Sequence, residues 1–152
     1  MRCKIIYPSA RLWIFLWALP AIFLSCRVTY LPSYDAEISE KIYEVARQVD
    51  RFYLLMQENS ERNYRFYAEE YINIEAELNS LYLRNKVRPL NENSTRICEI
   101  TLQLWQKYKD EHKTDKTVSD GLIKLNRKTF SDLFYAMQVA EKGKDMVSNP
   151  PE

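Results

Sequence analysis

Residues 38–56, ISEKIYEVARQVDRFYLLM, decide the fold of this chain. Their apolar side chains recur at intervals of four and three residues, at Ile38, Ile42, Val45, Val49, Phe52 and Met56. This spacing puts the apolar side chains on one stripe of a helix, which must pack along its whole length. The opposite face is charged and carries Glu40, Glu44, Arg47 and Arg51. We therefore expect an amphipathic helix from about residue 34 to residue 58, entered through Ser33 as N-cap.

A second apolar stripe follows in a different phase, at Tyr64, Tyr67, Tyr71, Ile74, Leu78 and Leu81. The segment 57–63, QENSERN, separates the two stripes and is wholly polar. A turn at residues 58–60, with Asn59 or Ser60 as the next N-cap, accounts for both the polarity and the change of phase. We expect a helical hairpin. One long helix stays open as the alternative, because neither Gly nor Pro enforces the turn.

The remaining sequence predicts two more helices. Pro89 ends the second helix, because the residue before a proline disfavours helical backbone. Asn93 or Ser94 can cap a third helix, whose apolar positions are Ile97, Ile100, Leu104, Trp105 and Tyr108. The segment 117–120 resembles a capping box and starts a fourth helix, with apolar positions at Leu122, Ile123, Phe130, Leu133, Phe134, Met137 and Ala140.

These elements predict an all-α protein, an antiparallel bundle of about four helices over residues 35–143 after an N-terminal signal segment. Gly143 is a good residue just past a helix end, and the Pro-containing tail 144–152 is expected to be disordered. No run of β-branched residues with a period of two argues for a sheet.

The N-terminal region carries an apolar, uncharged run, LWIFLWALPAIFLSC, from Leu12 to Cys26. Its only preceding charges are Arg2, Lys4 and Arg11. As a helix it measures about 22 Å at about 1.5 Å per residue, which is short of a hydrocarbon core of about 30 Å. A basic start followed by a short apolar run is typical of a secretory signal.

The end of that run, Phe23-Leu24-Ser25-Cys26, resembles the lipobox of bacterial lipoprotein precursors. Ser25 and Cys26 match the pattern, whereas Phe23 replaces the usual Leu and Leu24 is bulkier than usual. The resemblance implies cleavage before Cys26, so that residues 1–25 are the signal peptide and 26–34 a tether.

The resemblance further implies a lipid anchor on the Cys26 sulfur, commonly with a third acyl chain on its amine. Two or more acyl chains anchor a protein stably, at about 0.8 kcal/mol per buried CH₂. Because Arg27 rather than Asp follows Cys26, the resemblance implies sorting to the outer membrane. We expect the domain to face the periplasm, with surface exposure as the open alternative. Two alternatives remain: an uncleaved anchor helix, and a signal that is cleaved without lipidation.

The sequence offers no chemistry of a known catalytic or metal-binding kind. His112 is the single histidine and lies in a charged segment, KYKDEHKTDK, where a role at a helix C-terminus is expected. With Cys3 removed and Cys26 lipidated, Cys98 is the one remaining thiol, so a zinc site or a catalytic triad lacks its components. Glu69, Glu70, Glu75 and Glu77 are expected on a solvated helix face. We expect no enzyme, no cofactor, no metal and no small-molecule substrate.

The net charge argues against a nucleic-acid partner. The chain has 22 basic and 21 acidic residues, and without Arg2, Lys4 and Arg11 the basic residues number 19. Nucleic-acid binding proteins instead carry a basic face.

Tyrosine is abundant, with 11 residues in the chain. Aromatic side chains with a polar tip suit either the bundle periphery or a binding surface. A possible partner surface consists of aromatic residues on the flanks of the stripes, Tyr43, Tyr53, Phe66, Tyr82 and Tyr135. The expected function is a lipid-anchored envelope protein acting as a non-enzymatic binding or structural module, with another envelope protein as partner. The alternative is a single-pass accessory subunit of an envelope complex.

Overall fold

The computed structural model describes residues 31–150, which form four α-helices, a short 3₁₀ helix and no strand. The elements are α2 (Ala36–Glu58), η1 (Tyr64–Phe66), α3 (Ala68–Lys86), α4 (Glu92–Asp115) and α5 (Asp120–Ser148). The prediction of an all-α bundle of four helices is confirmed, as is the hairpin between the first two helices. The signal segment 1–25, Cys26 and the tether up to residue 30 lie outside the described residues.

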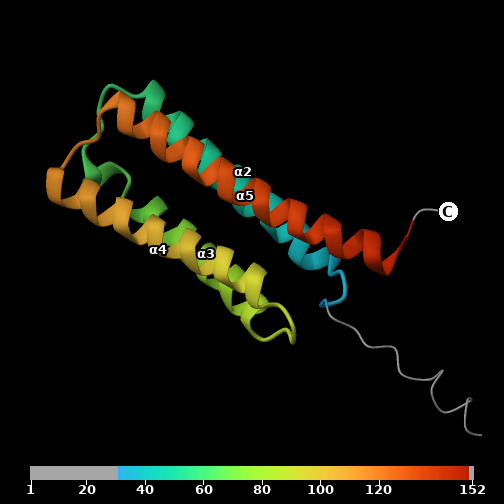
Figure 1. Cartoon of the computed structure of the whole chain (residues 1–152). Coiled ribbons are helices and arrows are strands. Elements are labelled where there is room, and N and C mark those ends of the chain that lie inside the picture. The colour runs from blue at the N-terminus through green and yellow to red at the C-terminus, as the bar shows by residue number, and fades with distance from the viewer. Residues whose placement is uncertain (1–30, 151–152) are drawn as a thin grey trace, which may run out of the picture. The chain divides into compact units, whose positions relative to one another are not determined.

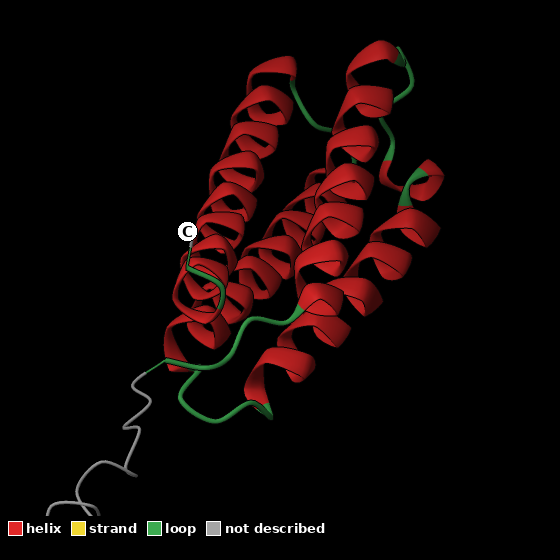
Figure 2. Cartoon of the chain, turned by 90° about the vertical axis from the view of Figure 1, so that its right-hand side faces the viewer, coloured by secondary structure: helices red, strands yellow, loops and turns green. Residues whose placement is uncertain are grey.

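The helices form a closed ring in which each packs against its two neighbours along the chain, and α5 packs back against α2 (Figures 1 and 2). Short links make successive helices antiparallel. One end of the bundle, here the tether end, holds residues 31–35, the α3–α4 link and the end of α5. The opposite end holds the α2–α3 connection with η1 and the α4–α5 link. A hydrogen bond joins these two connections, because the Tyr64 amide donates to the Lys116 carbonyl at 3.0 Å.

The core follows the predicted stripes on α2 and most of the predicted stripe on α3, but not throughout α4 and α5. On α4 the predicted Ile97, Ile100, Leu104 and Tyr108 are only half-buried, and on α5 the predicted Leu122 is 49% exposed. All six apolar residues of the α2 stripe are buried, as are Tyr67, Tyr71, Ile74, Leu78 and Leu81. The middle of the core is aromatic, with the rings of Phe52, Tyr71 and Phe130 all within 5.4 Å of the Trp105 ring, centroid to centroid. Each fully buried side chain of this size stabilises the fold by about 1.5–3 kcal/mol through burial alone.

Several helix boundaries differ from those expected. Asp35 rather than Ser33 caps α2, and its Oδ1 accepts from the amides of Glu37 and Ile38 at 3.0 and 3.1 Å. A carboxylate is a stronger acceptor than a hydroxyl, which favours this cap. The second helix begins later than expected, at Ala68, because η1 precedes it. Asn91 rather than Asn93 or Ser94 precedes α4.

The fourth helix continues through Gly143 to Ser148, so the expected end at Gly143 is wrong and residues 144–148 do not belong to a disordered tail. Lys144 explains the difference, because its side chain is buried against the α3–α4 link and makes the final turns part of the packed structure. Among residues 31–150, no helix is both long and apolar enough to cross a bilayer.

Candidate functional site: a helix groove and a buried polar cluster

A groove of about 380 Å³ runs along the junction of α2 and α5. The two tyrosines predicted for a partner surface, Tyr43 on α2 and Tyr135 on α5, both line it. They are 55% and 68% exposed. Its floor is apolar and comes from Ala46, Val49, Phe130 and Phe134. The structure thus brings together two aromatic residues that lie 92 positions apart in the chain.

Charged groups continue this groove toward the opposite end. Arg127 on α5 donates to both carboxylate oxygens of Asp50 on α2, at 2.7 and 3.3 Å. This bidentate pair also lines an adjoining hollow with Lys128 and Asp132, themselves paired at 2.7 Å. The carboxylate of Asp50 raises the pKa of Arg127, which stays charged. This α2–α5 groove therefore offers an apolar, aromatic part beside a charged part, in which Arg127 and Lys128 have carboxylate partners and Arg47 and Lys124 add further positive charge.

The other predicted surface residues do not join this groove. Phe66 is exposed in η1 at the opposite end, with the Arg65 guanidinium 4.6 Å from its ring. Tyr82 is half-buried on α3, with Lys86 Nζ 5.2 Å from its ring. The placement of Tyr53 on the surface is wrong, because it is 1% exposed and its ring stacks on Phe130. Its neighbour Phe52 is also buried, so the core stripe of α2 is two residues wide at this point.

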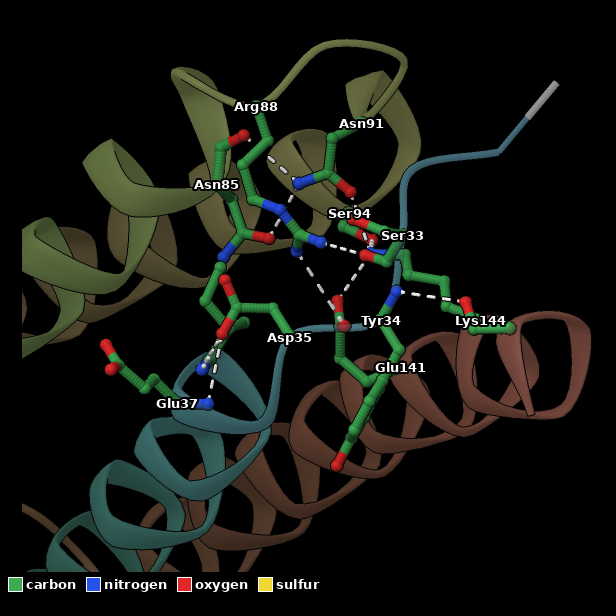
Figure 3. A network of polar contacts seen from close by, with 12 residues as sticks. Ser33, Tyr34, Asp35, Glu37, Asn85, Arg88, Asn91, Ser94, Glu141 and Lys144 are labelled. Atoms are coloured by element: carbon green, nitrogen blue, oxygen red, sulfur yellow. Dashed lines mark hydrogen bonds and ion pairs between the residues drawn. The ribbon is translucent and has the colours of Figure 1, made fainter. Parts of the chain in front are cut away.

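A buried polar cluster occupies the tether end (Figure 3). Lys144 on α5 is its centre: Nζ donates to Asn91 Oδ1 at 2.7 Å and to Ser94 Oγ at 2.9 Å, and it pairs with Glu141 one turn earlier. Asn91 in turn donates to Asn85 Oδ1 at 2.8 Å and to the Asn85 carbonyl at 3.1 Å. All five side chains are at least 94% buried. A buried charge of this kind requires a complete set of partners, and the cluster supplies them from three elements.

The polar cluster also fixes the segment that leads into α2. Arg88, from the α3–α4 link, lies 3.8 Å from Glu141 Oε2 and donates to the Ser33 carbonyl. The Tyr34 amide donates to Ser148 Oγ at 3.3 Å, near the end of α5. Ser33 is thus bound to the α3–α4 link and Tyr34 to the end of α5. The predicted tether is therefore attached to the bundle from Ser33 onward.

His112 lies in the last turn of α4, at the helix end where it was expected, but its side chain is buried and only 1% exposed. Its Nε2 lies 2.8 Å from the Arg62 carbonyl, which only accepts, so Nε2 carries the proton. Nδ1 therefore accepts from the Tyr71 hydroxyl at 3.1 Å. Burial lowers the pKa of His112, against the opposing effect of the Arg62 carbonyl. With both nitrogens engaged inside the core, His112 joins α4 to α3 and to the α2–α3 connection.

The acidic stretch of α3 forms ion pairs with its neighbours rather than a paired-carboxylate site. Glu77 lies 2.6 Å from Lys41 on α2, and Glu75 binds Gln106 at 2.9 Å and Lys109, both on α4. No cluster of three metal-ligating side chains occurs in the part of the chain that the structure describes.

The polar cluster was missed from the sequence although its positions carry a signal. Asn85 continues the spacing of Tyr71, Ile74, Leu78 and Leu81, and Lys144 continues that of Phe134, Met137 and Glu141. On α4 the buried residues follow the same three-and-four rhythm: Asn91, Ser94, Cys98, Thr101, Trp105 and His112. Polar residues in phase with a core stripe are therefore the feature that identifies both this cluster and His112.

The chain matches no protein-family model, no curated protein and no solved structure. Most polar atoms of the cluster bond one another inside the bundle, whereas Glu141 Oε2 and one Arg88 guanidinium nitrogen meet only as an ion pair at 3.8 Å. The groove instead presents aromatic surface to the outside.

Proposed function

We propose that this chain is a lipid-anchored protein of the bacterial cell envelope that binds another envelope protein without catalysing a reaction. Its anchor is Cys26, which follows the lipobox-like residues 23–25. Its binding surface is the α2–α5 groove. The observation that carries the binding role is the convergence of exposed Tyr43 and Tyr135 on one groove.

The shape and chemistry of the groove fit an amphipathic helix of the partner. Its lining on α5 spans residues 127–138, about 16 Å at about 1.5 Å per residue, which is the length of three helical turns. A helix laid between two helices buries its apolar residues at i, i+3, i+4 and i+7 in such a groove. Tyr43 and Tyr135 would flank the apolar anchors, and the Asp50–Arg127 pair would meet polar residues at one end.

The proposal is tested by replacing Tyr43 or Tyr135 in the full chain with a photo-crosslinking phenylalanine analogue and irradiating intact cells. The matched control is the same analogue at Phe66, an aromatic residue of similar exposure, 57%, outside the groove. We expect one protein adduct of the same identity from both groove positions and none from position 66. Adducts from position 66 alone would place the partner elsewhere, and the absence of any protein adduct would contradict the binding role.

Fatty-acid labelling separates this proposal from a single-pass accessory subunit. A lipoprotein takes up label at Cys26 and starts at that residue. A single-pass protein retains residues 1–25 and takes up no label there.

A further inference from the structure

Apolar side chains gather on the surface of the tether end. The segments that meet at this end carry six exposed apolar residues, which we call the tether-end patch: Leu31, Val87, Leu90, Val139, Met146 and Val147. Leu31, Leu90 and Val139 line one hollow of about 280 Å³ together with Pro32, Ala140 and Gly143. Met146 follows Val139 by seven residues, two turns along the same stripe of α5. The patch is therefore a surface made by residues 31–32, the α3–α4 link and the last turns of α5.

The length of chain between the patch and Cys26 is short. Leu31 is five residues beyond Cys26, and five extended residues reach at most about 18 Å. Residues 33 and 34 do not add to the free length of the tether, because Arg88 binds the Ser33 carbonyl and Ser148 binds the Tyr34 amide. A lipid anchor at Cys26 would thus keep Leu31, the patch residue nearest to the anchor along the chain, within about 18 Å of the membrane surface.

Two further features fit an apolar contact at this end. Leu90 has φ = 61°, a left-handed conformation that is unfavourable for a residue with a Cβ, and it holds the leucine side chain 49% exposed. Two ion pairs of opposite sign lie near this end, Arg84 with Glu37 and Lys142 with Asp145.

We propose that the tether-end patch lies against the lipid bilayer that holds Cys26, so that the bundle stands on the membrane in a fixed orientation. This inference rests on the proposed lipid anchor. Interfacial protein segments bury their apolar side chains about 5–10 Å into the boundary between headgroups and acyl chains. The orientation leaves the α2–α5 groove accessible along most of its length, because its lining on α5 runs from residue 138 back to residue 127, away from the tether end.

The test places a fluorophore at single positions of the full lipidated chain. Leu90→Cys and Met146→Cys report on the patch, and Leu125→Cys is the matched control at the far part of α5, with 58% exposure. Cys98 does not interfere, because it is buried. Each labelled protein is reconstituted into phosphatidylcholine vesicles with or without a lipid carrying a nitroxide on its acyl chain.

We expect the nitroxide to quench the probes at positions 90 and 146 at least about twofold more strongly than the probe at 125, since only the patch reaches the interface. Equal quenching at all three positions, in a protein whose fatty-acid label is lost in Cys26→Ala, would overturn the orientation and leave the lipid anchor intact. Label that persists in Cys26→Ala would refute the anchor, and with it the tether length on which the orientation depends.

Discussion

Replacing Lys144 by Met is the substitution whose effect follows most directly from the structure. The change keeps the length of the side chain and removes a charge that bonds Asn91, Ser94 and Glu141. Glu141, with a side chain 2% exposed, then keeps only Arg88 at 3.8 Å as a cationic partner. Removing one partner of a buried ion pair costs about 3–5 kcal/mol. Because Arg88 stays, we expect the lower end of that range, about 3 kcal/mol of unfolding free energy.

Urea denaturation followed by circular dichroism measures this loss. With an m value of about 1.5 kcal/mol/M, the midpoint should fall by about 2 M. Lys142→Met is the matched control, two residues away, where an exposed and solvent-screened pair with Asp145 should contribute little to stability. If Lys144→Met lowered stability no more than Lys142→Met, the polar cluster would not hold the tether end together as described.

Four further predictions concern the core and α5. The pKa of His112 in the folded protein lies below its unfolded value of about 6.5. The unfolded chain therefore binds more protons at this residue, and stability is lost as the pH falls below about 7 toward the folded-state pKa. The pH slope of the unfolding free energy should flatten in His112→Gln, and an unchanged slope would contradict the burial of His112. Trp105→Ala should lower the unfolding free energy by about 3–5 kcal/mol, since the indole is fully buried and donates to the Tyr71 carbonyl at 3.0 Å; a loss below about 1 kcal/mol would argue against an aromatic core. Gly143→Ala should raise stability by about 0.5–1 kcal/mol in the same assay, because a Cβ there meets nothing within 4 Å; a decrease would mean that α5 ends at Gly143. Burial raises the pKa of the Cys98 thiol to about 12, so a thiol reagent at neutral pH should modify Cys98 only after unfolding, and rapid reaction of the native protein would contradict the packing of α4.

The fold followed from the sequence most closely on α2. Ile38 to Met56 form an uninterrupted four-and-three pattern, and every member is buried. The prediction was poorer where the buried stripe contains polar residues. His112 was predicted to act at a helix C-terminus, Lys144 was placed in a disordered tail and Glu141 was left unassigned, although their spacing puts them in phase with the buried residues of their helices.

The meeting of two aromatic residues in the α2–α5 groove could not be predicted from the spacing within either helix. Tyr43 and Tyr135 were both predicted on a partner surface, but their meeting depends on the closure of the ring, in which the last helix packs against the first. Spacing along one helix carries no information on its neighbour in space. The burial of Tyr53 has a related cause, because α2 contacts both α3 and α5 and so needs a core stripe wider than one residue per turn.

Fatty-acid labelling of Cys26 tests the central claim, a lipid-anchored protein, most directly. Cells that express the full chain are grown with a labelled fatty acid, and the purified protein is examined for label and for its N-terminal residue. Cys98→Ala is the matched control, since it removes a buried thiol without touching the anchor. We predict label in the unaltered protein and in Cys98→Ala, a mature chain that starts at Cys26, and no label in Cys26→Ala. Label that persists in Cys26→Ala, or an unlabelled protein that retains residues 1–25, would contradict the claim.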